Sequence, residues 1–172
     1  MNTSLIVAIC AISIIFIKLW FNKKEREKER VAEIAFEAEK VQRSLDKVAT
    51  LKTPTAQIRH CETALAQLYK LEEYPNVRSV VSNLDELKVR LHALIKVLPI
   101  MKHIEKAYRH QFKGAEKAEK NALLDALYDI ETNDVTNEDF FNAETFPEGT
   151  GEIVEIESIK RRLTQLGWSA SK

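Results

Sequence analysis

The chain has few residues of the kinds that make tight turns or cross-links. Its 172 residues include four glycines, four prolines and two cysteines. Small secreted domains usually carry paired cysteines, and sheets need many tight turns, so this composition argues against both classes. Cys10 lies in an apolar N-terminal run and Cys61 in the charged remainder, so we expect no disulfide between them and a reducing compartment for the body.

Motifs that carry chemistry are absent as well. The sequence has no His-Glu-x-x-His or Cys-x-x-Cys spacing and no glycine-rich phosphate loop. His103 and His110 have no evident third ligand, and Cys61 falls on an apolar helical face, where a cysteine packs as a small hydrophobe. Asp125 and Asp129 have no partners of metal-ligand type, so we interpret them as exposed acids. We therefore predict a non-enzyme without catalytic residues, metal or cofactor.

The zero net charge of the chain conceals an asymmetry. Residues 1–120 hold 22 basic and 15 acidic side chains, residues 121–158 hold 11 acidic and no basic ones, and residues 159–172 hold four basic ones. Separated charge bears on partners and self-association rather than on fold.

Residues 1–21 are predicted to form a transmembrane anchor. Leu5 to Phe21 is a 17-residue apolar run with a single charge, Lys18. As a helix it spans about 26 Å, close to the ~30 Å hydrocarbon core, and Lys18 can snorkel to the interface that suits Trp20. A cleaved signal peptide is disfavoured, because the run lacks a basic leader and a small-residue cleavage site.

Basic flanks predict the direction of this anchor. They all follow the apolar run, at Lys18, Lys23, Lys24, Arg26, Lys28 and Arg30. The positive-inside rule then places the N-terminus outside and the body in the cytoplasm, on the inner or plasma membrane of the cell.

Residues 22–52 are predicted to form a charged juxtamembrane helix. Its apolar residues hold heptad spacing, at Val31, Ile34, Ala38, Val41, Leu45 and Val48. Such a seam indicates either a short parallel coiled-coil dimer or a helix that packs on its own domain.

Residues 53–131 are predicted to form a helical hairpin or bundle. Thr53-Pro54 starts a helix that ends near Tyr74-Pro75. The next helix carries a long apolar stripe, which Pro99 should end or kink: Val77, Val80, Leu84, Leu87, Leu91, Leu94, Leu98 and Met101. Helix resumes over 100–131, with Gly114 as a possible interruption, and Tyr108 and Phe112 are expected in the core.

Residues 132–172 are predicted to form an acidic helix-turn-helix and a C-terminal helix. Thr136 and Asp139 have the spacing of a capping box. A loop follows at 146–151. The last helix closes at Gly167, where Trp168 can fold back on Leu163; a strand at Ile153–Ile156 is the alternative for its first turn.

Leu127 to Glu144, LYDIETNDVTNEDFFNAE, resembles two known motifs. Its second half resembles the exit of an EF-hand loop, but the required ligand positions fall on Phe140 or Tyr128, which excludes calcium coordination. The segment also resembles a helix-turn-helix hairpin of the SHOCT type, although it lacks the usual turn glycine. That resemblance implies a role in association.

One row of basic residues is the candidate binding site. Lys102, Lys106, Arg109, Lys113, Lys117 and Lys120 share a helical face if the helix runs through Gly114. The row is either a solvated face or a site for an acidic protein, anionic lipid or nucleic acid. Few exposed aromatic residues are expected beside it, which weakens the case for single-stranded nucleic acid. The acidic segment is expected to shield the row.

The sequence thus predicts an all-α, single-pass membrane protein with a juxtamembrane heptad helix and a small helical bundle. The leading hypothesis is a membrane-anchored adaptor or scaffold, with a protein partner or a second copy as ligand. One alternative is an anionic-lipid or nucleic-acid binder that uses the basic row. A second is a phage-type lysis or envelope-spanning protein.

Overall fold

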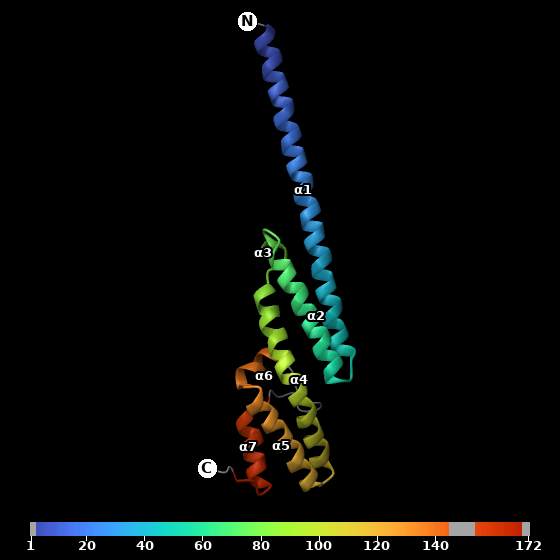
Figure 1. Cartoon of the computed structure of the whole chain (residues 1–172), viewed down its shortest axis with the longest axis vertical. Coiled ribbons are helices and arrows are strands. Elements are labelled where there is room, and N and C mark those ends of the chain that lie inside the picture. Colours follow the sequence, from blue (N-terminus) through green and yellow to red (C-terminus); the bar gives the residue numbers. More distant parts are fainter. Residues whose placement is uncertain (1–2, 145–153, 170–172) are drawn as a thin grey trace.

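The computed structural model describes residues 3–144 and 154–169, and side chains from residue 18 onward. This part of the chain contains helices and no strand, so the predicted all-α bundle is confirmed (Figure 1). The helices are α1 (Thr3–Thr50), α2 (Pro54–Glu72), α3 (Val77–Val80), α4 (Leu84–Phe112), α5 (Glu116–Thr132), α6 (Asn137–Ala143) and α7 (Ile156–Gln165).

The first helix, α1, is continuous and only its C-terminal half joins the bundle (Figure 1). Ile34, Val41 and Val48 are buried there, whereas Val31 is 46% exposed. The heptad seam therefore packs against α2 of the same chain, which is the second of its two predicted roles.

The predicted anchor lies largely outside the described side chains, which begin at residue 18. The backbone is nevertheless helical from Thr3, and no break separates the apolar run from the charged segment that follows it. In the part of the chain whose side chains are described, no helix has the length and apolar character needed to cross a membrane.

The second helix starts as predicted, with Thr53 in an extended conformation and Pro54 in the first turn. It runs antiparallel to α1, and the hydroxyl of Tyr74 donates a hydrogen bond of 3.0 Å to Glu33. The apolar stripe predicted as one helix from Val77 is split into α3 and α4. The longer helix begins after Asn83, whose side chain makes no capping hydrogen bond, and the acidic residues Asp85 and Glu86 in its first turn favour a helix start there.

The fourth helix, α4, passes through Pro99 without ending there, contrary to one predicted outcome. Its neighbours Val97, Leu98 and Ile100 are all buried. Packing on both sides of the proline therefore outweighs the roughly 3 kcal/mol that a proline costs inside a helix. The polar contacts of α4 with α2 precede Pro99, and those with α5 follow it.

A glycine turn separates α4 from α5. Gly114 has φ +65°, a left-handed conformation that glycine adopts at little cost. The amide of Ala115 donates a hydrogen bond of 3.0 Å to the carbonyl of His110. The amide of Gly114 donates one of 3.0 Å to the carbonyl of Gln111, and the two bonds end α4. The chain then reverses and α5 packs antiparallel to α4.

Two predicted helix ends are confirmed near the C-terminus. The Thr136 hydroxyl accepts the amide of Asp139, whose carboxylate accepts the amide of Thr136, a complete capping box. The amide of Trp168 bonds to the Leu163 carbonyl at 2.9 Å, which forms the expected cap of α7. The alternative strand is not seen at Val154 and the residues that follow it, and the loop at 146–151 lies outside the described residues.

Candidate interaction surfaces

The row of basic residues does not lie on one helix. The break at Gly114 leaves Lys102, Lys106 and Arg109 exposed on α4 and moves Lys117 and Lys120 to α5, so the prediction of a single cationic face is corrected. Left-handed backbone at the glycine ends the helical register, and the charges beyond it no longer continue the line.

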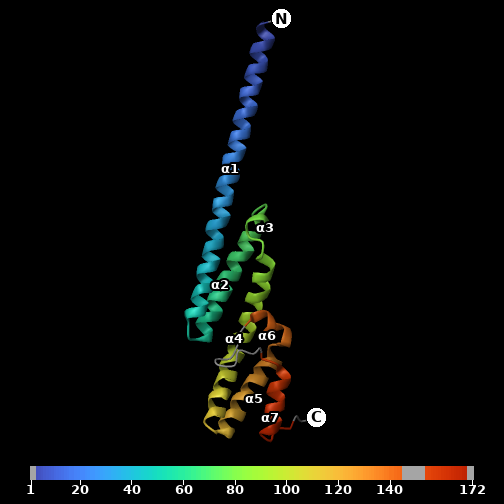
Figure 2. The ribbon, with the colours of Figure 1, turned by 180° about the vertical axis from the view of Figure 1, so that it is seen from behind.

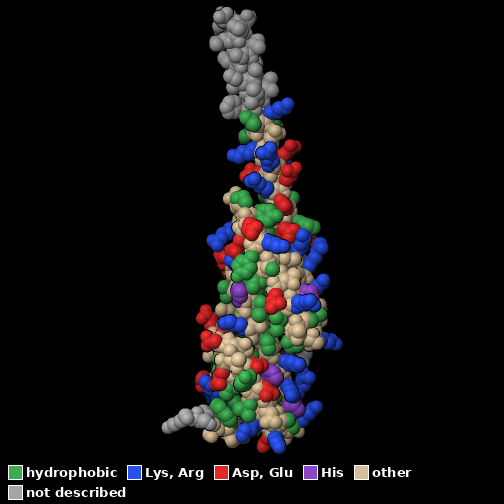
Figure 3. Space-filling model, in the orientation of Figure 1, with side chains coloured by type: hydrophobic (Ala, Val, Ile, Leu, Met, Phe, Trp, Pro, Cys, Tyr) green, Lys and Arg blue, Asp and Glu red, His purple; other side chains and the backbone are tan. Residues whose placement is uncertain are grey.

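The basic residues of this row differ in what they contact. Arg109 lies 3.6 Å from Glu105, and Lys120 donates a hydrogen bond of 3.0 Å to the carbonyl of Gly167 at the end of α7. Within residues 3–144 and 154–169, no ion pair involves the four others, which are Lys102, Lys106, Lys113 and Lys117. Figure 3 shows blue side chains on the lower part of the molecule, interspersed with red and green ones, and others further up.

Two aromatic residues expected in the core are at the surface. Phe112 is 91% exposed and Tyr108 is 37% exposed. The end of α4 packs through Ile104 and Ala107, and Phe112 follows Ala107 by five residues, which turns it about 140° away from the core. The argument against exposed rings beside the basic row therefore fails.

The acidic segment, residues 121–158, forms ion pairs with basic residues outside the basic row. Asp139 pairs with Lys96 at 3.1 Å and Glu144 with Arg90 at 3.1 Å, both in the first half of α4. Across the described residues, no ion pair joins this segment to the basic row. Shielding of the row, as expected from the sequence, has no support in these contacts.

The surroundings of the Asp139 carboxyl lower its pKa. Partial burial acts to raise its pKa, but the backbone amide of Thr136, the ammonium of Lys96 and the Thr136 hydroxyl outweigh burial and lower it. This carboxylate therefore stays ionised to a lower pH than an ordinary aspartate, and it ties α6 to α4.

A buried ion pair joins α5 to α7. The guanidinium of Arg162 donates through Nε and Nη2 to the two carboxylate oxygens of Glu119, at 2.6 and 3.0 Å. Glu119 is 2% exposed, and it was not singled out from the sequence. The hydrogen bonds to Glu119, together with its negative charge, raise the pKa of Arg162. Such a two-point contact fixes the orientation of α7.

His103 lies between two carboxylates of α5. Its Nδ1 is 3.7 Å from Asp125 and its Nε2 is 3.5 Å from Asp129, so these acids are not isolated as the sequence suggested. Nδ1 is buried without a hydrogen-bond partner. The two acids approach different ring nitrogens, and in the described part of the chain no group of three such side chains could hold a metal ion.

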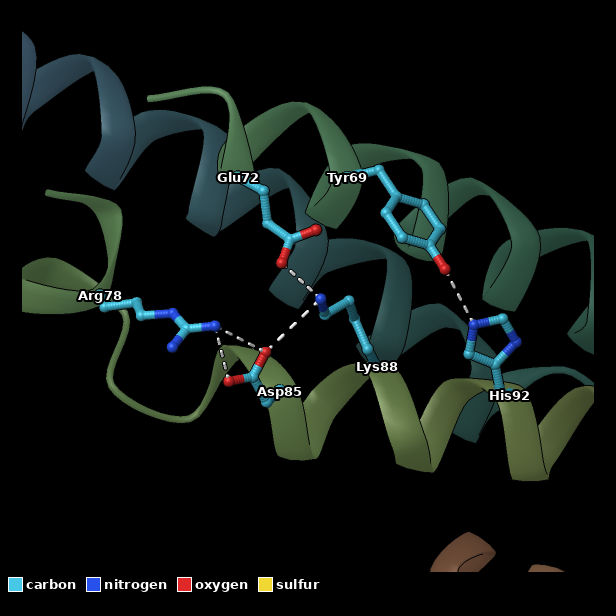
Figure 4. A network of polar contacts seen from close by, with 6 residues as sticks. All are labelled: Tyr69, Glu72, Arg78, Asp85, Lys88 and His92. Carbon is cyan, nitrogen blue, oxygen red and sulfur yellow. Dashed lines mark hydrogen bonds and ion pairs between the residues drawn. The ribbon is translucent and has the colours of Figure 1, made fainter. Parts of the chain in front are cut away.

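A polar ladder joins α2 to α4 near their shared turn (Figure 4). Lys88 contacts both Glu72 and Asp85, and Arg78 reaches Asp85 at 3.0 Å. One turn further, the hydroxyl of Tyr69 and Nε2 of His92 are 3.0 Å apart. Their contacts align two antiparallel helices.

A groove of about 560 Å³ lies between α4, α5 and α7. Ile104, Leu123 and Ile159 supply apolar walls, and the Glu119–Arg162 pair borders it. Ser158 and Tyr108 bring hydroxyl groups to its lining, which contains no histidine or cysteine among the described residues.

The free thiol of the body is inert. Cys61 is fully buried on α2, and burial, followed by the nearby Glu62, raises its pKa to about 11. The thiolate is the reactive form of cysteine, so this position serves packing, as expected from the sequence.

Comparison with known proteins gives no assignment: no family model, curated protein or solved structure matches this chain.

Proposed function

We propose that this protein is a membrane-anchored helical adaptor that holds a partner-binding body in the cytoplasm. The observation that carries the proposal is the continuity of α1 from Thr3 to Thr50. Its N-terminal part contains the apolar run Leu5–Phe21, and its C-terminal half is built into the core through Ile34, Val41 and Val48.

This arrangement supports a stiff connection between anchor and body. From Phe21 to Ile34 the helix rises about 20 Å, and no proline or glycine interrupts it. A flexible linker would leave the orientation of the body undefined. A helix shared by both parts would instead hold the bundle at a set distance from the bilayer.

An adaptor role is also supported by how the polar clusters are used. The Glu119–Arg162 pair, the Lys96–Asp139 pair and the contacts around Lys88 each join one helix to another. Exposed cations and Phe112 lie instead on α4 and α5, where they remain available to a second molecule. The heptad seam is occupied by α2, which removes the main reason to expect a coiled-coil dimer.

The anchor is tested by alkaline extraction of membranes from cells that express the full chain. We expect the protein in the pellet, and Ile14→Lys combined with Ile15→Lys should release it, because two charges at the centre of the run oppose insertion. A wild-type chain found in the supernatant would contradict the proposed membrane anchor.

The direction of insertion is tested with paired C-terminal reporters. A fluorescent-protein fusion should be bright and an alkaline phosphatase fusion inactive, because the basic flanks follow the apolar run. The reverse result would place the body outside and favour an envelope-spanning protein.

A further inference from the structure

The turn between α4 and α5 lies, with the C-terminal end of α7, at the end of the molecule opposite the N-terminus of α1 (Figures 1 and 2). We call Arg109, Phe112, Lys113 and Lys117 the distal tip. The length of α1 from Phe21 to Thr50 is about 43 Å, and the distal tip lies beyond its end. The distal tip therefore cannot reach the bilayer that holds the proposed anchor.

The distal tip combines one exposed aromatic ring with three exposed basic residues that are close to it in the sequence. Phe112 is 91% exposed, the highest value among the exposed large hydrophobic residues that are described. Lys113 ends α4 and Lys117 lies in the first turn of α5, with neither engaged in an ion pair among the described side chains. Residues 106–117 hold four basic side chains and one acidic one, Glu116.

The backbone around this ring is regular. Phe112 lies in the last turn of α4, and hydrogen bonds of 3.0 Å from Gly114 and Ala115 back to α4 close the turn that follows it. Phe112 is rotated about 140° around the helix from the buried Ala107, so it lies on the face of α4 that points away from the core. Its exposure therefore follows from its position on a regular helix.

We propose that the distal tip docks on a second, anionic bilayer, with Phe112 in the interfacial layer and the cations on lipid headgroups. This inference rests on the proposed anchoring by α1, and together they make the protein a bridge between two membranes. Aromatic rings favour the interfacial layer, and basic side chains are attracted to an anionic surface.

Other partners fit the distal tip less well. Single-stranded nucleic acid stacks its bases on several rings, and here Phe112 is 91% exposed whereas Tyr108 exposes only 37% of its surface. A stable protein interface buries roughly 800 Å² on each side, which a convex turn with one projecting ring does not offer. A bilayer surface needs neither a matching pocket nor a row of rings.

The test uses the full chain reconstituted into vesicles of neutral phosphatidylcholine. Acceptor vesicles with about a third of anionic phosphatidylserine are added, and energy transfer between lipid dyes reports clustering. We expect clustering that weakens with salt, because charge attraction to the surface is screened. Phe112→Ser should lower the apparent affinity about tenfold, as expected for loss of an inserted ring.

Charge variants and matched controls complete the experiment. Lys113→Glu with Lys117→Glu should weaken clustering by at least about 25-fold, since each cation contributes roughly fivefold. Two control variants should leave the clustering unchanged. Phe141→Ser alters another phenylalanine, whose side chain is 64% exposed, and Lys70→Glu alters an exposed lysine outside the distal tip.

Several outcomes would overturn this inference. These are equal clustering of neutral acceptors, full clustering by Phe112→Ser, or no clustering by a chain that is shown to be incorporated. A single-stranded oligonucleotide that binds through Phe112 without any clustering would overturn it in favour of nucleic acid. Failure of the chain to incorporate into the first vesicle would instead contradict the anchor, so the two failures are distinguishable.

Discussion

Arg162 of α7 and Glu119 of α5 meet across 43 residues of chain, through two hydrogen bonds of 2.6 and 3.0 Å. The carboxylate is almost fully enclosed, whereas the arginine side chain keeps 35% of its exposure. The two groups therefore contribute unequally: the acid depends on its partner, and the arginine can still reach water.

Arg162→Met should destabilise the protein by about 3 kcal/mol, because it leaves an uncompensated charge at Glu119 in the core. Denaturant unfolding followed by circular dichroism measures this loss. Arg161→Met, at the exposed neighbouring position, is the control and should change little. Adding Glu119→Leu to Arg162→Met should recover much of the stability, and a neutral single variant would contradict this account of the pair.

Asp139→Asn should flatten the acid side of the stability profile. The folded-state pKa of Asp139 is lowered, so its contribution is present above the unfolded pKa of about 3.9 and is lost as pH falls through the folded value. Loss of the capping carboxylate should cost about 1 kcal/mol at neutral pH. Urea unfolding at several pH values tests this, and Glu138→Gln, at an exposed site in the same turn, should retain the wild-type slope.

Cys61 should resist alkylation in the folded protein. At pH 8 a thiol with a pKa of about 11 is almost wholly protonated, and the ordinary pKa near 8.5 returns on unfolding. In a Cys10→Ser background, iodoacetamide should react at least about 100-fold more slowly without urea than with it. Similar rates in both states would show that α2 opens readily around this side chain.

Ile34→Asp with Val41→Asp should unfold the body rather than merely prevent self-association. Both side chains are almost fully buried between α1 and α2, and an unpaired buried charge at each costs several kcal/mol, comparable to the total stability of a domain. Val31→Asp changes a 46% exposed position of the same seam and should stay folded. Thermal melts compare the three chains, and a fully stable double variant would restore the coiled-coil interpretation.

Local features of this fold could be predicted from the sequence because their partners are close along the chain. The box formed by Thr136 and Asp139 spans three residues, and the cap that joins Trp168 to Leu163 spans five. Backbone geometry alone brings such groups together. The all-helical class also followed from composition and apolar spacing.

The contacts between helices could not be predicted in the same way. Glu119 and Arg162 come into contact only when α5 packs against α7. His103 lies next to Asp125 only because the chain reverses direction at Gly114. The spacing of the seam that contains Ile34 is equally suited to a partner from the same chain or from another. The prediction that Phe112 lies in the core is wrong, because apolar character alone does not show at which residue a helix extends beyond the core.

The path of the chain between α1 and the distal tip also determines how the protein responds to tension. The chain runs down α1, back up α2 and down α4, so a pull between the two ends would slide these helices lengthwise past one another (Figure 1). The α1–α2 and α2–α4 interfaces would then be loaded in shear, with all of their packed side chains resisting at once. A helix pair that is opened from one end yields contact by contact, and this topology therefore makes the rod mechanically strongest along the axis that joins its two ends.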